Sequence, residues 1–257
     1  MPLVESYLDG PVGTLVMNHP ERRNALGAVF ISEFITGLHS LLRARARVVV
    51  VRALDGAGAW SAGHDVSELA GGDPLAPDQP LPRLLREVEK CPVPILAMID
   101  AGAYGGAVEL ALTCDLRVGS ERASFTMPPA RLALPYSAEG LARFIRVLGL
   151  ATTQELFFTA RTADAERSVR VGLLTYLVPS VELEVFTQQL AEKIARNSPR
   201  CIRALKASLR LLSEAAPLPT KNIEQINALR RHVLASHDYQ EGLEAFRLKR
   251  RPVFEDI

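Results

Sequence analysis

The sequence predicts an α/β fold, and three features of the chain favour that class. Apolar and β-branched runs at 48–51 and 93–99 show no alternation, which is typical of strands buried on both faces. Segments with helical spacing of apolar residues, at 26–43 and 81–90, alternate with these strands and favour mostly parallel pairing. After about residue 180 only helical spacing is found. A chain of 257 residues suits one large α/β domain with a helical appendage.

The amino-terminal third is expected to contain a strand, a second strand, a helix and a third strand. Residues 4–8 and 13–18 are strand candidates, and the Asp-Gly-Pro sequence at 9–11 predicts a turn between them. Residues 19–23 break the pattern before the helix at 26–43 begins.

Loops and helix breakers divide the rest of the chain. Two loops rich in Gly, Ala and Pro lie at 55–64 and 70–82, and the second is long and polar, as loops over binding sites often are. Beyond them, breakers separate four stretches of helical spacing, at 181–196, 200–212, 221–236 and 239–247. We expect residues 1–197 to form the ligand-binding core and residues 198–257 to form a helical region that makes subunit contacts and caps the site.

Composition and charge exclude several classes of function. Thirty Lys and Arg against 29 Asp and Glu leave a net charge of +1, which gives no general attraction to nucleic acid or anionic membrane. Three distant cysteines form neither a disulfide framework nor a CxxC metal pair. No signal peptide is indicated, and the longest apolar run is too short to cross a bilayer. We expect a cytoplasmic protein with no nucleic-acid partner, no membrane partner and no metal.

Two glycine-containing turns follow the two buried strands and form the candidate site. The first is WSAGHD at 60–65, and the second is AYGGAVE at 103–109, which opens a helix. Small residues let a ligand approach the backbone, and a helix amino terminus presents unpaired N–H groups. Two such donors aimed at one point hold a developing negative oxygen. From spacing alone this signal is weak, and plain tight packing of glycine-rich turns is the favoured interpretation. Walker A, HExxH, GxSxG and GxGxxG motifs are absent.

The residues of these turns and their flanking motifs resemble the crotonase (enoyl-CoA hydratase/isomerase) superfamily. Asn-His-Pro at 18–20 and Asn-Ala-Leu at 24–26 precede the first turn, and Cys-Asp at 114–115 follows the second. The match covers essentially the whole chain in the family's order. The resemblance implies a crotonase-type spiral of β-β-α units with a carboxy-terminal helical trimerisation region, and an acyl-CoA thioester as substrate.

The resemblance also implies the residues that bind this substrate. In the family two backbone N–H groups polarise the thioester carbonyl, and here they match His64 and Gly106. The implied binding residues for the substrate and its CoA moiety are Ala25, Ala62, Gly63, His64, Asp65, Val66, Gly105, Gly106, Pro128 and Lys249.

The segment around residue 129 separates two kinds of family member. A typical hydratase places two glutamates around one water, and Glu109 matches the first of them. Pro129 occupies the place of the second, and proline has no ionisable group for acid or base catalysis. Hydration or isomerisation of the usual kind therefore lacks one carboxylate.

Three further segments resemble the decarboxylases of this superfamily that act on methylmalonyl-CoA. They are Ser-Ala-Gly-His-Asp at 61–65, Leu-Pro-Tyr at 134–136 and Asp-Tyr-Gln-Glu-Gly at 238–242. In those enzymes a tyrosine matching Tyr136 contacts the substrate carboxylate, and a lysine matching Lys249 contacts CoA. Pro128 is a departure, because those decarboxylases carry a threonine there.

We therefore expect cofactor-independent decarboxylation of a malonyl-CoA-type thioester, either methylmalonyl-CoA or a related 2-alkylmalonyl-CoA. Loss of CO2 leaves an enolate, which chiefly needs an oxyanion hole and requires no metal, biotin or redox cofactor. The expected catalytic residues are His64, Gly106, Tyr136 and Glu109.

Other hypotheses stay open. One alternative is an enoyl-CoA hydratase or isomerase that uses Glu109 on a 2-enoyl-CoA. Another is a non-catalytic relative that binds acyl-CoA or RNA. Bound RNA would need a continuous basic surface, and the net charge of +1 argues against RNA alone. The apolar surface of the last four helices predicts self-association as a trimer, or as a hexamer of two trimers.

Overall fold

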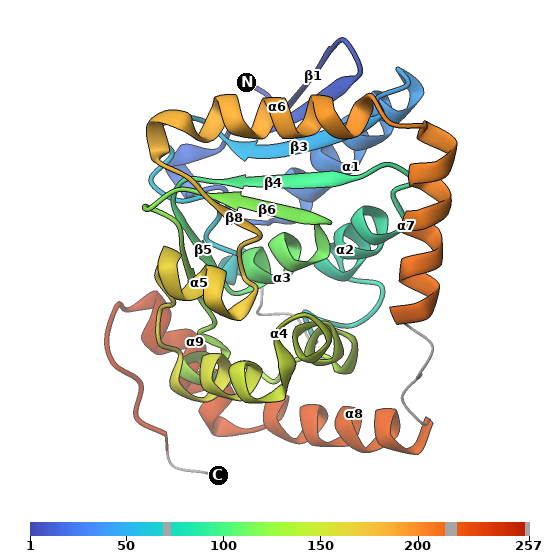
Figure 1. Cartoon of the computed structure of the whole chain (residues 1–257). Coiled ribbons are helices and arrows are strands. Elements are labelled where there is room, and N and C mark those ends of the chain that lie inside the picture. The colour runs from blue at the N-terminus through green and yellow to red at the C-terminus, as the bar shows by residue number, and fades with distance from the viewer. Residues whose placement is uncertain (69–72, 214–219, 255–257) are drawn as a thin grey trace.

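A six-stranded sheet lies between two layers of helices (Figure 1). The computed structural model describes residues 1–68, 73–213 and 220–254. The strand order is β1-β2-β3-β4-β6-β8. The strands are β1 (Val4–Asp9), β2 (Val12–Met17), β3 (Val48–Ala53), β4 (Ile95–Ile99), β6 (Leu116–Gly119) and β8 (Tyr176–Leu177).

The pairing confirms the predicted mostly parallel sheet. β1 and β2 form an antiparallel hairpin around the predicted turn, and every other neighbouring pair in this sheet is parallel. The strand predicted from residue 93 pairs with β3 only from Ile95, because Pro94 carries no backbone N–H to donate to a ladder.

The strand β3 is buried on both faces, as its uninterrupted valines predict. Val49 and Val51 face a core with α1 (Ala28–Arg43), α2 (Pro80–Lys90) and α3 (Gly106–Thr113). Val48 and Val50 face a second core under α6 (Leu183–Ala195), which crosses the other face of the sheet in Figure 1. The sheet is therefore a rigid support for the loops at the ends of its strands.

A small second sheet turns the chain into a spiral. It consists of β5 (Gly102–Tyr104) and β7 (Ser124–Thr126), which pair in parallel. β5 follows β4 and leads into α3, whereas β7 follows β6 and leads towards α4 (Ala138–Thr159). These β-β-α units confirm the predicted fold class.

The carboxy-terminal part is helical, as predicted, and the last strand in the described chain ends at Leu177. The boundary expected at 197–198 lies between α6 and α7, and the division into two domains stays a prediction. The remaining helices are α5 (Ala165–Val171), α7 (Pro199–Ser213), α8 (Thr220–Leu234) and α9 (His237–Arg247), with short 3-10 helices at Pro20–Arg22, Val66–Glu68, Pro129–Leu132 and Ser180–Glu182.

Two smaller points concern the predicted loops and the membrane. The loop predicted at 70–82 lies partly outside the described residues, and its end already belongs to α2, which begins at Pro80. Within the described ranges, no helix has the length and apolar character needed to span a bilayer.

Candidate active site

Backbone hydrogen bonds join the two glycine-containing turns to each other. The Trp60 N–H donates to the Gly102 carbonyl at 2.9 Å, and the Tyr104 N–H donates to the Ser61 carbonyl at 3.1 Å. The Gly105 N–H donates to the Thr126 carbonyl at 2.9 Å, which ties the second turn to β7. The second sheet therefore fixes both turns in one place.

Gly63 is required for this close approach. Its φ is +82°, in the left-handed region that favours glycine, and a Cβ there would collide with the carbonyl oxygen of Tyr104. The same Cβ would lie 3.1 Å from the Gly106 nitrogen, whereas a Cβ on Gly106 would lie 3.5 Å from the His64 nitrogen. The His64 and Gly106 N–H groups are thus neighbours.

Both of these N–H groups are free to bind a ligand. Within the part of the chain that the structure describes, neither the His64 N–H nor the Gly106 N–H has an acceptor. Gly106 is the first residue of α3, where a helix leaves its N–H groups unpaired and carries partial positive charge. The pair has the chemistry of an oxyanion hole, and its catalytic role stays a prediction.

A cavity of about 470 Å³, the inner cavity, lies beside these donors. Tyr136 closes one side of it, and Arg23 and Arg131 also reach its lining. No Asp or Glu lines this cavity among the described residues, so its chemistry is not that of paired carboxylates. Its apolar wall is formed by Leu75, Leu81, Pro128, Pro129, Leu132 and Leu134.

A second cavity of about 740 Å³, the outer cavity, shares part of its lining with the inner one. The two share Ala62, His64, Val66 and Phe246, so a long ligand can extend from one into the other. The outer cavity is also lined by Ala25, Asp65 and several residues of α9. Its basic side chains are Arg22 and Arg247.

Asp65 shapes the loop at the outer cavity. Its carboxylate accepts hydrogen bonds from the Ser67 N–H at 3.0 Å and the Ser67 hydroxyl at 2.6 Å, and it lies 3.5 Å from Arg22. Burial raises the pKa of Asp65, but the Ser67 bonds and Arg22 outweigh burial and hold this pKa below its usual range. Asp65 is therefore an ionised loop anchor at neutral pH.

The imidazole of His64 faces both cavities. Burial lowers its pKa against the opposing effect of Asp65, so the neutral form is favoured. Its Nδ1 is buried and has no hydrogen-bond partner among the described residues. The imidazole and the backbone N–H of this residue are thus two separate groups in the site.

Behind the inner cavity, Tyr136 contacts a buried ion pair that the sequence did not predict. The Tyr136 hydroxyl donates to Glu109 Oε2 at 2.6 Å, and Arg143 Nη1 donates to Glu109 Oε1 at 2.6 Å. Desolvation raises the pKa of Glu109, while Arg143 and the Tyr136 hydrogen bond oppose that rise. Burial also raises the pKa of Tyr136 well above its ordinary value, so the phenol stays protonated.

The structure brings most of the predicted residues to the two cavities. Gly63 and Glu109 lie behind the lining, the former as a backbone hinge and the latter as the partner of Tyr136 and Arg143. Lys249 follows α9 in a turn, where its N–H donates to the Phe246 carbonyl at 3.1 Å, and it lines neither cavity. The predicted residues that line at least one cavity are Ala25, Ala62, His64, Asp65, Val66, Gly105, Gly106, Pro128 and Tyr136.

Helices from the end of the chain complete the enclosure. Arg230 of α8 donates to Asp73 at 2.5 Å, beside the segment that brings Leu75 into the wall. α9 packs against the 3-10 helix at Pro129–Leu132, where a Cβ on Gly242 would collide with the Leu132 carbonyl. Phe246, which was not predicted as a site residue, thereby reaches both cavities.

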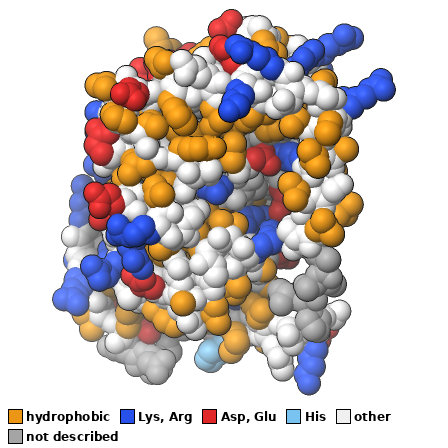
Figure 2. Space-filling view, viewed as in Figure 1, with side chains coloured by type: hydrophobic (Ala, Val, Ile, Leu, Met, Phe, Trp, Pro, Cys, Tyr) orange, Lys and Arg blue, Asp and Glu red, His pale blue; other side chains and the backbone are white. Residues whose placement is uncertain are grey.

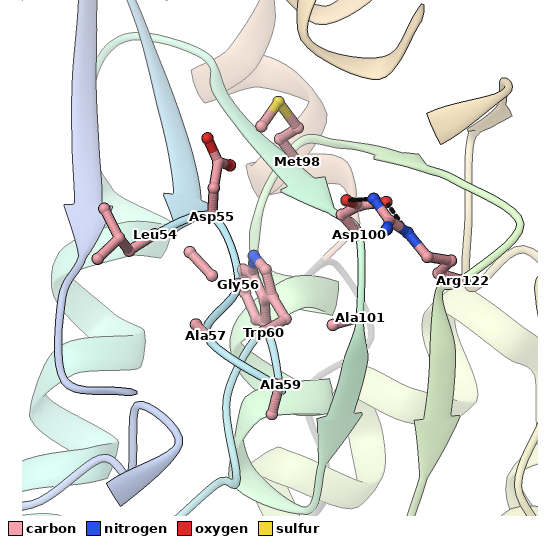
Figure 3. Close-up of a pocket in the computed structure, with 12 residues that line it drawn as sticks. Leu54, Asp55, Gly56, Ala57, Ala59, Trp60, Met98, Asp100, Ala101 and Arg122 are labelled. Atoms are coloured by element: carbon pink, nitrogen blue, oxygen red, sulfur yellow. Dashed lines mark hydrogen bonds and ion pairs between the residues drawn. The ribbon is translucent and has the colours of Figure 1, made fainter. Parts of the chain in front are cut away.

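A third cavity of about 480 Å³ lies at the carboxyl ends of β3 and β4 (Figure 3). The indole of Trp60 lines it, and its Nε1 is buried with no hydrogen-bond partner among the described residues. An ion pair between Asp100 and Arg122 forms another part of the lining, as the dashed lines in Figure 3 show. This cavity contains neither of the free N–H donors. Within the described ranges, no group of three or more His, Cys, Asp or Glu side chains is arranged to hold a metal ion.

Comparison with known proteins relates this geometry to a family. A family model described as enoyl-CoA hydratase/isomerase matches residues 9–257. Methylmalonyl-CoA decarboxylase of Escherichia coli (strain K12) is 38% identical over 95% of this chain and 94% of that protein. The 2,3-dehydroadipyl-CoA hydratase of the same organism is 30% identical over 93% of each chain.

Solved structures agree with this relationship. The structure of methylmalonyl-CoA decarboxylase in complex with 2-nitronate-propionyl-CoA superimposes with a TM-score of 0.96, at 37% identity over 99% of both chains. An enoyl-CoA hydratase/isomerase from Pseudoalteromonas atlantica T6c is 23% identical over 98% of this chain and 100% of that one. Its TM-score of 0.83 shows a shared fold.

Proposed function

This chain belongs to the enoyl-CoA hydratase/isomerase family, and on that premise we propose that it decarboxylates a malonyl-CoA-type thioester. The substrate is methylmalonyl-CoA or a related 2-alkylmalonyl-CoA. Support comes from the relative that is a methylmalonyl-CoA decarboxylase. It also comes from the solved structure of a methylmalonyl-CoA decarboxylase in complex with 2-nitronate-propionyl-CoA.

The two free N–H groups are placed to stabilise the negative charge that forms in this reaction. The thioester oxygen accepts hydrogen bonds from the His64 and Gly106 N–H groups, with the C2 substituents in the inner cavity. The bond between C2 and the carboxylate breaks, CO2 leaves, and the electron pair of that bond forms an enolate whose charge rests on the thioester oxygen. A donor pair fixed in advance stabilises this charge without reorganisation. A proton then adds to C2 and gives the acyl-CoA product.

One observation carries the preference for decarboxylation over hydration: no Asp or Glu of the described chain lines the inner cavity. Hydration needs a group that takes a proton from water and one that delivers a proton to carbon. Pro129 stands at one expected carboxylate position, and Glu109 at the other is engaged by Tyr136 and Arg143. Decarboxylation needs neither proton transfer before the bond breaks.

The outer cavity is the proposed place of the CoA moiety. Ala25, Ala62, Asp65 and Val66 line it close to the donors. Arg22 and Arg247 at this cavity, and Lys249 in the turn beyond α9, supply positive charge for the CoA phosphates. The protein is expected to act in the cytoplasm, where CoA thioesters and reduced cysteines occur together.

Product analysis tests this function directly. Purified protein is incubated separately with malonyl-CoA, methylmalonyl-CoA and crotonyl-CoA, and the CoA products are separated and identified by mass. We expect loss of CO2 from at least one malonyl-type thioester and negligible addition of water to crotonyl-CoA. Brisk hydration of crotonyl-CoA without CO2 release from any malonyl-type thioester would establish the hydratase alternative instead.

We also propose that the protein assembles as a trimer or as a hexamer of two trimers. No residue of α7 is buried in the single chain, and its leucines 205, 209, 211 and 212 are all more than half exposed. Figure 2 shows hydrophobic side chains gathered on this side of the molecule, over the position of α7 in Figure 1. A second copy that covers this face removes the apolar area from water.

Light scattering coupled to size exclusion measures this assembly. We expect a mass of three or six chains at micromolar concentration, and we expect Leu209→Glu to reduce it by placing a charge in the contact. A wild-type monomer at that concentration would disprove the proposed assembly.

A further inference from the structure

A buried polar chain leads from the inner cavity towards the surface through α3, α4 and α2. It begins at the Tyr136 hydroxyl, which lies 2.6 Å from Glu109, and it continues to Arg143, also 2.6 Å from Glu109. Arg143 then contacts Glu89 of α2 at 3.1 Å. The side chains of Glu109 and Arg143 are only 3% and 8% exposed, so water competes little for these contacts.

The donors and acceptors of this chain have fixed directions. A guanidinium only donates hydrogen bonds, and an ionised carboxylate only accepts them. A phenol has one hydrogen, so when Glu109 is ionised that hydrogen of Tyr136 must point to Glu109. That hydrogen is then not available to a ligand in the inner cavity, which Tyr136 lines.

We propose that Arg143 is a positioning residue that, through its ion pair with Glu109, directs the Tyr136 hydroxyl hydrogen away from the substrate. The proposal rests on the proposed decarboxylation and adds a determinant of reaction specificity to it. Its effect is twofold. The substrate carboxylate receives no hydrogen bond from Tyr136, and Glu109 is withheld from acid–base chemistry.

This arrangement favours the loss of CO2. Hydrogen bonds stabilise a charged carboxylate more than neutral CO2, so a site that withholds them destabilises the bound reactant relative to the transition state. Part of the cavity wall is apolar, and its Pro128 and Pro129 side chains cannot donate a hydrogen bond to the substrate carboxylate.

The Tyr136 ring itself is held by packing that does not involve Arg143. Phe144 and Phe157 meet it edge to face, with ring centroids 6.1 Å and 5.1 Å away. A Cβ on Gly140 would lie 2.6 Å from a ring carbon, so the helix backbone touches the ring as well. A change at residue 143 is therefore expected to alter the direction of the hydroxyl hydrogen while the ring keeps its place.

Arg143→Gln removes the charge that favours the ionised form of Glu109, and Arg146→Gln is its matched control. Arg146 lies one helical turn away and pairs with Glu89 at 3.6 Å without a bond to Glu109. For Arg143→Gln at neutral pH we expect kcat for decarboxylation to fall at least about tenfold. The KM should stay equal or fall, because the freed hydroxyl now binds the reactant carboxylate. Arg146→Gln should keep kcat within about twofold of wild type.

The pH profile supplies a readout that a simple packing defect does not move. The groups that face Glu109 are Tyr136, Arg143 and, more distantly, Glu139. Arg143 and Glu139 both lie on α4. Because Arg143 lowers the pKa of Glu109, its removal raises that pKa. The kcat of Arg143→Gln should therefore recover as pH rises and Glu109 ionises, with a midpoint above any wild-type midpoint. The double variant Glu109→Gln/Arg143→Gln should lose this step.

Thermal unfolding tests the ion pair independently of activity. A carboxyl group with a raised folded pKa contributes stability at low pH that is lost as pH rises through that pKa. The Tm deficit of Arg143→Gln relative to wild type should therefore widen as the pH is raised from 5 to 9, and the double variant should remove the widening.

The outcomes separate this inference from the proposed function. Absence of CO2 release by wild type refutes the function, whereas the Tm experiment still decides whether Arg143 keeps Glu109 ionised. If wild type is active, the inference is overturned when folded Arg143→Gln has the same kcat as Arg146→Gln at every pH. A rise in KM at unchanged kcat overturns it as well.

Discussion

Replacing Gly106 by proline is expected to slow turnover by a factor of about 10² to 10³, the usual cost of losing one oxyanion-hole donor. Proline removes the N–H outright. Residue 106 is the first of α3, a position where helices accept proline, so the fold should survive. Steady-state kinetics on the malonyl-type substrate, with circular dichroism as the check on folding, measures the effect.

Two matched variants isolate the N–H group from the side chain. Gly106→Ala keeps the N–H but adds the Cβ that meets Leu81 at 2.7 Å, so it reports the steric cost alone. His64→Ala keeps its N–H and removes only the imidazole. Both should be milder than Gly106→Pro. If His64→Ala were as damaging as Gly106→Pro, the imidazole would be catalytic and the backbone account wrong.

The second large effect is expected at Tyr136. Tyr136→Phe should slow CO2 release by at least about tenfold, or roughly 1.4 kcal/mol of barrier. The variant removes the hydroxyl of a residue that lines the inner cavity and leaves Glu109 without its neutral donor, while the ring packing is kept. Rates of CO2 release and of crotonyl-CoA hydration are measured for both wild type and variant.

Tyr176→Phe is the control, because Tyr176 lies on β8 away from both cavities. It should behave as wild type. Glu109→Gln is not a mild change in this fold, since it leaves the buried Arg143 with only the partly buried Glu89 as a charged partner. A hydratase would lose crotonyl-CoA hydration in Glu109→Gln and show little effect in Tyr136→Phe, and that order would contradict decarboxylation.

The fold was predictable because its elements carry local signals. The valines of β3 and the apolar run that ends in β4 predicted strands buried on both faces, and two cores do cover them. The last four helices were predicted by their periodicity and by the breakers between them. β5 and β7 were not predicted, since strands of three residues carry too little pattern.

Some residues of the site were predictable from the sequence, and others were not. Gly63 and Gly106 are readable from the sequence because the chemistry depends on backbone groups and on the absence of a Cβ. Arg143 was not predicted, because its role depends on α3 and α4 packing 34 residues apart in the chain, and no local pattern reports such a contact. Leu81 and Phe246 were not predicted either, because only the packing of α2 and α9 in the folded chain brings them to the inner cavity.

The central claim is that the two N–H groups hold an enolate made by loss of CO2. The most direct test is to turn over methylmalonyl-CoA in heavy water and to determine the mass of the acyl-CoA product and the CO2 released. The account predicts propionyl-CoA with one deuterium at C2 and one CO2 for each molecule formed, because solvent supplies the proton that replaces CO2. Recovery of unchanged methylmalonyl-CoA, together with addition of heavy water across the double bond of crotonyl-CoA, would contradict it.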